Sequence, residues 1–276
     1  MSSEKLSDKA LCTDKKGQTL VLKADHLSIQ FGGLKAVDDV NLSISQGELY
    51  GLIGPNGAGK TTMFNLLTGV YKPTSGRFFL CGRELTGKSP LEINRAGIAR
   101  TFQNIRLFNN LTVLENVMVG MTNQIRCTMP ESIFRLPRHF SAEKQFREKA
   151  YELLKVFQLE KFADYQAQNL PYGKQRTLEI ARAMATNPTL LLLDEPAAGM
   201  NPQETLELAS FIREIRDHFQ KTILLIEHHM DLVMGIADRI YVLDFGKLIA
   251  QGTPEEIQNN ERVIDAYLGV ADDAED

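Results

Sequence analysis

The hydrophobic positions of the chain follow two periods, which divide it into strands and helices. Residues 20–44 alternate apolar and polar side chains, as in LVLKADHLSIQF, and predict antiparallel strands with one face exposed to water. Three later segments are almost continuously apolar, which is typical of strands buried on both faces. These segments are GELYGLIG (47–54), TLLLLDE (189–195) and KTILLIEHH (221–229).

Between the strands, apolar residues recur every three or four positions, which predicts helices that cover a sheet. The predicted helices span 60–67, about 112–121, 143–157 and 177–185. Strands that alternate with helices predict an α/β fold with a mainly parallel sheet, to which the N-terminal strands add an antiparallel β subdomain.

The C-terminal third carries clear helix and turn signals. Asn201 suits an N-cap and Pro202 the first helical position, so a helix is predicted to begin there. Residues 244–246 predict the turn of a hairpin. Thr253 to Glu256 form a capping-box pattern that predicts the start of a last helix.

Composition and charge exclude some functions. A formal charge of −4 over 276 residues gives no general attraction to nucleic acid, so we expect no nucleic-acid partner. Cysteines 12, 81 and 127 are far apart, which disfavours a disulfide framework or a thiolate metal site and indicates a reducing compartment. The polar N-terminus lacks the pattern of a signal peptide, and no apolar run is long enough to span a bilayer.

The first candidate site lies between an apolar strand and a predicted helix, where GPNGAGKT fits the phosphate-loop pattern GxxxxGK[ST]. Glycines let backbone N–H groups approach phosphate oxygens, while Lys60 would reach the β- and γ-phosphates and Thr61 would bind Mg²⁺. The alternative is an ordinary Gly-rich turn, but the position between strand and helix favours a nucleoside triphosphate site. The residues predicted to bind are Gly54, Pro55, Asn56, Gly57, Ala58, Gly59, Lys60, Thr61 and Thr62.

The second candidate site is Asp194-Glu195, at the end of a predicted buried strand. Asp194 could hold Mg²⁺, and Glu195 could polarise an attacking water as a general base; the alternative is two acids that cap a strand. Gly54, Asp194 and His228 all follow predicted buried strands, so a parallel sheet would bring them to one edge. No lid signature of a kinase and no guanine-recognition motif of a GTPase is present, which favours hydrolysis.

With these motifs the chain resembles the ATP-binding subunits of ABC transporters, from about residue 20 to 268. The resemblance implies Mg²⁺ ligands at Thr61, Gln103 and Asp194, and catalytic roles for Lys60, Glu195 and His228. It also implies that Phe31 stacks on adenine and that Gln103 reports Mg·ATP occupancy to the membrane partner. The alternatives are that Phe31 is a core aromatic and Gln103 a surface amide.

The ABC signature, normally LSGGQ, is replaced here by Leu170-Pro171-Tyr172-Gly173-Lys174. Proline removes both the hydroxyl and an N–H donor. Gly173 still permits close approach, Lys174 adds a positive charge, and a helix is expected from about Lys174. We therefore expect a weakened but functional signature that acts across a dimer through Leu170, Gly173 and Lys174; the alternative is a plain helix start.

Three stretches of the chain resemble the ATPases of branched-chain (hydrophobic) amino acid importers. They are LPYG, RTFQNIRLFNNLTVLENVMVG and IEHHMDLVMGIADRIYVLDFG. This resemblance implies a bacterial importer with two permease subunits, a second ATP-binding subunit in a heterodimer (a homodimer being the alternative) and a periplasmic solute-binding protein. The chain would lie at the cytoplasmic face of the inner membrane. Alternatives are a transporter for another solute, a soluble ABC ATPase or a small-molecule kinase.

The expected layout is one ABC ATPase domain at 19–270, between a disordered tail at 1–18 and an acidic tail at 271–276. It includes a helical subdomain at about 104–185 with an insertion at about 122–145. Basic side chains of the insertion could contact anionic lipid, or could simply be solvated. The apolar residues of 102–116 are candidates for the permease contact or for the core.

Overall fold

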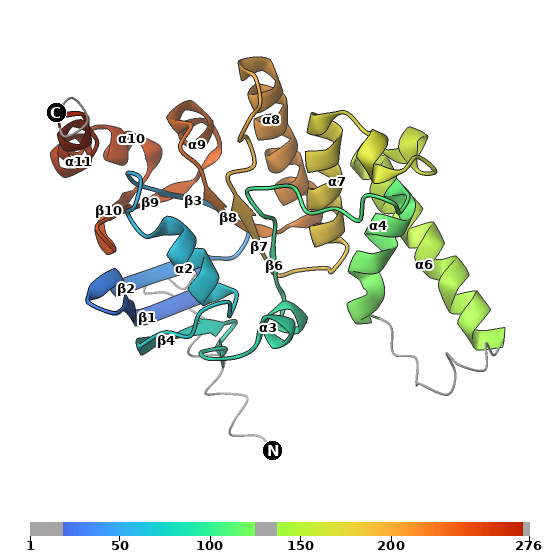
Figure 1. The fold of residues 1–276 in the computed structure, drawn as a ribbon, viewed down its shortest axis with the longest axis horizontal. Helices are drawn as coiled ribbons and strands as arrows, with labels where there is room; N and C mark the ends of the chain where they lie inside the picture. The colour runs from blue at the N-terminus through green and yellow to red at the C-terminus, as the bar shows by residue number, and fades with distance from the viewer. Residues whose placement is uncertain (1–18, 125–136, 273–276) are drawn as a thin grey trace. The chain divides into compact units, whose positions relative to one another are not determined.

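The structure is a computed structural model that describes residues 19–124 and 137–272 (Figure 1). The tail predicted at 1–18 and most of the acidic tail lie outside the described residues, as does the middle of the insertion predicted at 122–145. The chain divides into two compact units. The first unit contains residues 1–100 and 189–276, and the second contains residues 101–188.

Within the described residues, the first unit has an antiparallel sheet of four strands in the order β2-β1-β4-β5. Its strands are β1 (Leu20–Phe31), β2 (Leu34–Ser45), β4 (Ser75–Leu80) and β5 (Arg83–Glu84). The long pair β1 and β2 alternates buried and more exposed positions along much of its length. The antiparallel strands predicted from the alternating pattern are therefore confirmed.

The first unit also has a mainly parallel sheet, six-stranded over the described part, in the order β10-β9-β3-β8-β7-β6. Its strands are β3 (Leu49–Ile53), β6 (Ile98–Arg100), β7 (Leu190–Asp194), β8 (Thr222–Ile226), β9 (Arg239–Asp244) and β10 (Lys247–Gly252). Every residue of β3, β7 and β8 is buried, as the continuous apolar runs predict. Strand β10 pairs antiparallel with β9 through the predicted hairpin turn.

In the described part of the first unit, four helices lie between strands along the chain, and two more follow the last strand. They are α2 (Lys60–Leu67), α3 (Pro90–Ala96), α8 (Pro202–Phe219), α9 (Met230–Ile236), α10 (Pro254–Gln258) and α11 (Glu261–Asp272). Asn201 caps α8 through the N–H of Glu204, as predicted. The capping box at Thr253 is also present, but it begins α10 and not the last helix. Asn260 accepts a hydrogen bond from the Arg262 N–H and so starts α11, which continues into the predicted acidic tail.

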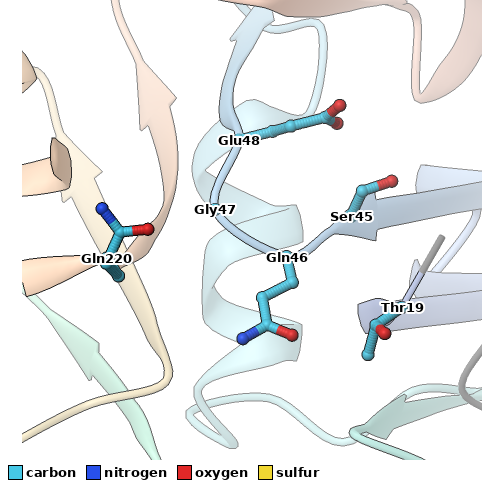
Figure 2. Close-up of a pocket in the computed structure, with 6 residues that line it drawn as sticks. All are labelled: Thr19, Ser45, Gln46, Gly47, Glu48 and Gln220. Atoms are coloured by element: carbon cyan, nitrogen blue, oxygen red, sulfur yellow. The ribbon is translucent and has the colours of Figure 1, made fainter.

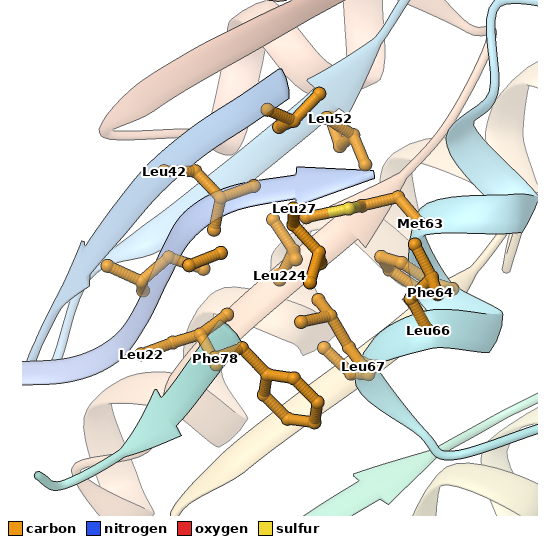
Figure 3. Packing of buried hydrophobic residues seen from close by; sticks show 14 of the residues in the cluster. Leu22, Leu27, Leu42, Leu52, Met63, Phe64, Leu66, Leu67, Phe78 and Leu224 are labelled. Carbon is orange, nitrogen blue, oxygen red and sulfur yellow. The ribbon is translucent and has the colours of Figure 1, made fainter. Parts of the chain in front are cut away.

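One hydrophobic core joins both sheets of the first unit to α2 (Figure 3). Met63, Phe64 and Leu67 of α2 are fully buried, at the helical spacing that predicts this helix. They belong to the same cluster as Leu52 of β3 and Phe78 of β4. Helix α2 is thus fixed against the sheets by its apolar face, and this fixes the loop that precedes it.

The second unit is helical over its described residues. It contains α4 (Val113–Gly120), η1 (Met121–Gln124), α6 (Pro137–Val156), η2 (Glu160–Phe162), η3 (Ala167–Asn169) and α7 (Tyr172–Met184). Helix α4 contacts both α6 and α7. The helices predicted at 143–157 and 177–185 are present, but both begin earlier than predicted, because their first turns, PRHF and YGKQ, show no apolar period.

Candidate nucleotide site

The phosphate-loop sequence connects β3 to α2 and is closely packed. Gly54 and Gly59 have φ values of 148° and 99°, which are strained for any residue with a Cβ. A Cβ at Gly54 would lie 2.0 Å from the carbonyl oxygen of Leu243, and one at Gly59 would lie 2.4 Å from that of Ala36. Glycine is therefore required at both positions by the packing of the chain itself.

Lys60 is the first residue of α2 and is 6% exposed. Its Nζ donates hydrogen bonds to the carbonyl oxygens of Gly54 (2.6 Å) and Pro55 (2.8 Å). Burial lowers the pKa of Lys60, and the negative charge of Glu195 opposes part of that shift. The ammonium group thus lies over the loop and within the electrostatic field of Glu195.

Strands β3, β8 and β7 are adjacent and parallel, so the residues that follow them meet at one edge of the sheet (Figure 1). Gly54 follows β3, Asp194 ends β7, and His228 comes shortly after β8. This is the edge at which open parallel sheets bind ligands. The sheet therefore brings the phosphate loop, the acidic pair and the histidine to one side of the first unit.

Glu195 and His228 contact each other directly. Glu195 Oε2 lies 2.7 Å from His228 Nε2, and the Glu195 side chain is 8% exposed. Glu195 has φ of 47°, a left-handed conformation that costs about 1–3 kcal/mol for such a residue and is concentrated at functional sites. Its N–H donates to the carbonyl oxygen of Ile226, which ties the start of this loop to β8.

Sequence reasoning missed Arg100, the last residue of β6. Its guanidinium contacts Asp194 Oδ2 at 2.6 Å and donates to Asn65 Oδ1 at 2.7 Å and to Thr68 Oγ1 at 3.3 Å. Both Arg100 and Asp194 have almost fully buried side chains. The arginine precedes the predicted glutamine motif in GIARTFQ, but its role depends on the pairing of β6 with β7, which the motif does not reveal.

Phe31 ends β1 and is 44% exposed, so the alternative that it is a core aromatic is wrong. Its ring makes an edge-to-face contact with Tyr71, with 5.1 Å between ring centroids. Tyr71 is also exposed, and sequence reasoning did not identify it. The pair presents aromatic surface to solvent, and the stacking of Phe31 on adenine stays a prediction.

Gln103 belongs to the second unit, and its backbone is fixed by helix α7. The guanidinium of Arg176 donates to the carbonyl oxygens of Phe102 and Gln103, at 2.7 Å each. Arg176 is paired with Glu179 at 2.8 Å, and Glu179 in turn accepts from the N–H of Arg106. This fully buried ion pair links the loop of Gln103 to the helix that begins with the signature sequence.

Two apolar residues of 102–116 bear on the alternatives for that segment. Phe108 is 48% exposed and packs against the guanidinium of Arg182, whereas Leu114 is buried. Phe108 therefore presents aromatic surface to solvent, and Leu114 belongs to the interior of the second unit. Residues 102–116 therefore include both a buried and an exposed apolar side chain.

The signature region begins α7 two residues earlier than predicted, at Tyr172 instead of Lys174. Pro171 takes the N-cap position, with φ of −55°, and its carbonyl accepts from the N–H of Gln175. Leu170 is buried, whereas Tyr172 is 45% exposed. A Cβ added at Gly173 would meet no atom of the described residues within 4 Å. Packing within this chain therefore does not require glycine at that position.

A separate hollow of about 380 Å³ lies near the other ends of the same strands (Figure 2). Thr19, Ser45, Gln46, Gly47, Glu48 and Gln220 line it. Glu48 precedes β3 and Gln220 precedes β8, whereas the phosphate loop follows β3. The hollow is therefore distinct from the phosphate-loop site.

Comparisons with known proteins agree with this geometry. A family model described as ABC transporter matches residues 37–198, and another described as branched-chain amino acid ATP-binding cassette transporter matches residues 247–273. The chain belongs to the ATP-binding cassette (ABC) family of transporter ATPases. It therefore binds nucleotide and hydrolyses ATP, and the expected fold is confirmed.

Among its relatives is the high-affinity branched-chain amino acid transport ATP-binding protein LivG of Salmonella typhimurium. The two are 51% identical over 251 residues, which is 91% of this chain and 98% of that protein. BraF of Pseudomonas aeruginosa, of the same description, is 46% identical over 251 residues, or 91% of this chain and 98% of BraF. The resemblance to these importer ATPases is confirmed.

The chain is similar to a solved ATP-binding cassette of an ABC transporter in its ADP conformation. The TM-score is 0.79 and the sequence identity is 32%, and the match covers 91% of this chain and 99% of that one. It is also similar to a dimeric cassette in a post-hydrolysis state, bound to ADP and Pi. The TM-score is 0.70 and the sequence identity is 26%, and the match covers 84% of this chain and 98% of that one. In the described part of this chain, no helix is both long and apolar enough to cross a membrane.

Proposed function

We propose that this chain is the ATP-hydrolysing subunit of a bacterial importer for branched-chain or hydrophobic amino acids. The observation that carries the ATPase mechanism is the contact between Glu195 and His228, at the sheet edge that also holds the phosphate loop. The solute is inferred from relatives whose names include branched-chain amino acid transport and that match this chain over 91% of its length. ATP binding and hydrolysis would drive a conformational change in the permease.

The hydrolytic step follows from the positions of three side chains. Lys60 and the N–H groups at the start of α2 would bind the β- and γ-phosphates. Glu195 would accept a proton from the attacking water, and His228, held at 2.7 Å from Glu195, would contact the γ-phosphate. The positive charges near the γ-phosphate would stabilise the negative charge of the transition state.

The residues present fit a magnesium ion. Mg²⁺ prefers oxygen ligands, and the hydroxyl of Thr61 and the carboxylate of Asp194 in the first unit supply that chemistry. Gln103, the third expected ligand, belongs to the second unit. When bound, Mg²⁺ would supply positive charge that neutralises the negative charge developing on the phosphate. Because Arg100 already contacts one oxygen of Asp194, we propose that Arg100 holds this carboxylate in place for the metal.

We propose further that two ATPase subunits close on ATP, with the signature of one subunit facing the phosphates of the other. The open space at Gly173 supports this, because it leaves room for another molecule. The second subunit would be a different ATP-binding protein, with a homodimer as the alternative. Two permease subunits and a periplasmic binding protein would complete an assembly in which this chain lies at the cytoplasmic face of the inner membrane.

The domain layout is part of the same proposal. Residues 19–270 would act as one ATPase domain, in which a helical subdomain at about 104–185 directly follows Gln103 and carries the signature. Phe108, half-exposed and close to Gln103 in sequence, is a candidate for the permease contact. The alternatives remain a transporter for another solute and a soluble ABC ATPase.

Uptake by intact cells tests the proposal. Deletion of this gene is expected to abolish high-affinity uptake of labelled leucine, and the wild-type gene should restore it. A Lys60→Ala gene should not restore uptake, although its product is expected to reach the same cellular level. Unchanged leucine uptake in the deletion strain would refute the proposed solute class, and co-purification without any membrane protein would favour a soluble ABC ATPase.

A further inference from the structure

Glu227 is a buried carboxylate to which the nucleotide-site motifs assign no role. It follows β8 and precedes His228, and its side chain is completely buried. A buried carboxylate is costly unless hydrogen bonds replace the water that it has lost. Its partners therefore indicate what it does.

The two oxygens of Glu227 bind two different segments of the first unit. Oε1 accepts from the N–H of Ala197 at 2.8 Å. Oε2 accepts from the N–H groups of His228 (3.0 Å) and His229 (3.3 Å), and it lies 3.0 Å from His229 Nδ1. One carboxylate thus joins the segment after β7 to the segment after β8.

These two segments carry the pair that the proposed mechanism uses. Glu195 lies just before Ala197 on the first segment, and His228 lies on the second. The contact of 2.7 Å between Glu195 and His228 requires both backbones to be held in register. The left-handed conformation of Glu195 also needs support from its surroundings. The hydrogen bond from the Glu195 N–H to Ile226 fixes the start of the first segment, and Glu227 fixes its continuation.

We propose that Glu227 is a positioning residue for ATP hydrolysis, which holds the Glu195 and His228 segments together through its two carboxylate oxygens. The proposal rests on the roles proposed above for Glu195 and His228. Glu227 reaches both segments through their backbone N–H groups, so it acts through the backbone and not on the substrate. A carboxylate suits this place because all its partners can be donors, whereas an amide would direct an NH₂ group at one of them.

The test is Glu227→Gln in the full-length chain, with kcat measured by phosphate release and ATP affinity by equilibrium binding. We expect kcat to fall about 10- to 100-fold, because small displacements at an active site are costly, while the Kd for ATP changes less than about 2-fold. Glu207→Gln, an exposed change of equal charge, should keep wild-type kcat. His229→Gln, which leaves the three backbone donors in place, should lower kcat less than about 3-fold.

A double-mutant cycle with His228→Ala separates positioning from a general structural effect. If Glu227 acts through His228, adding Glu227→Gln to His228→Ala lowers single-turnover hydrolysis little further. Full additivity would overturn the proposal, as would wild-type kcat in a folded Glu227→Gln chain. If thermal melting shows that Glu227→Gln does not fold, Glu227→Asp replaces it in the test. Aspartate keeps the negative charge, but its side chain is too short to accept hydrogen bonds from both segments. Wild-type kcat in a folded Glu227→Asp chain would then overturn the proposal. A His228→Ala chain with wild-type turnover would instead refute the proposed role of His228.

Discussion

At the scale of single residues, the nucleotide site is supported by charged groups that are buried and paired. Arg100 contacts Asp194, and Glu227 accepts hydrogen bonds from two loops. A charge removed from water is costly, so each of these groups stays in the one arrangement that satisfies it. The result is a set of catalytic candidates whose backbones are held before nucleotide arrives, which is the condition for efficient electrostatic catalysis.

Glu195→Gln tests the general base. The amide cannot accept the proton of the attacking water, so turnover should fall by at least about 100-fold, the lower end of what a general base contributes. ATP should still bind, because Lys60 and the phosphate loop are unchanged. Phosphate release and equilibrium ATP binding measure the two effects, and near wild-type turnover would remove Glu195 from this role.

At the scale of elements, helix α7 connects two motifs of the second unit. It begins with the signature sequence, and one and two turns later Arg176 and Glu179 bind the backbone of the loop that carries Gln103. Arg176 and Glu179 are both buried, so their contact offsets the cost of removing both charges from water. The loop and the start of the helix should therefore move together.

Arg176→Met should lower the free energy of unfolding by about 3–5 kcal/mol, because it leaves Glu179 buried without its countercharge. Replacing Glu179 as well, by Leu, should recover much of this loss, since two apolar side chains carry no desolvation penalty. Urea denaturation of both variants measures the difference. If the single variant is as stable as the wild type, the ion pair does not hold the loop.

The elements differ in how well the sequence predicts them. Strands β3, β7 and β8 are predictable because burial on both faces requires continuous apolar runs. The starts of α6 and α7 are not predictable, because their first turns show no repeat of apolar residues. Phosphate-loop residues such as Lys60 follow from a motif, whereas Arg100 and Glu227 depend on which strands become neighbours. Glu227 looks like the polar end of an apolar strand, and only its contacts reveal that it joins two loops.

At the scale of the whole molecule, the proposed mechanism needs a second ATPase subunit that faces the signature of this chain. Gly173 lies in the first turn of α7 with open space beside it, and Tyr172 next to it is half-exposed. Both fit a surface that meets another subunit when nucleotide is bound.

Gly173→Arg tests that surface. The substitution should leave the melting temperature unchanged, because the site is open, but it should abolish ATP-dependent association of Glu195→Gln chains with their partner subunit. Gly235→Arg is the matched control, since Gly235 is also helical and a Cβ there also meets no atom of the described residues within 4 Å. Sedimentation with and without ATP measures association. Equal association of the two variants would contradict a role for the signature glycine across the dimer.

The proposed mechanism depends on ATP binding where the phosphate loop meets Asp194 and Glu195. The decisive measurement is a crystal structure of the Glu195→Gln chain with Mg²⁺ and ATP. We expect Lys60 Nζ to leave the carbonyl oxygens of Gly54 and Pro55 for phosphate oxygens, with the metal beside Thr61 and Asp194. A nucleotide bound at any other place, with Lys60 still on those two carbonyls, would contradict it.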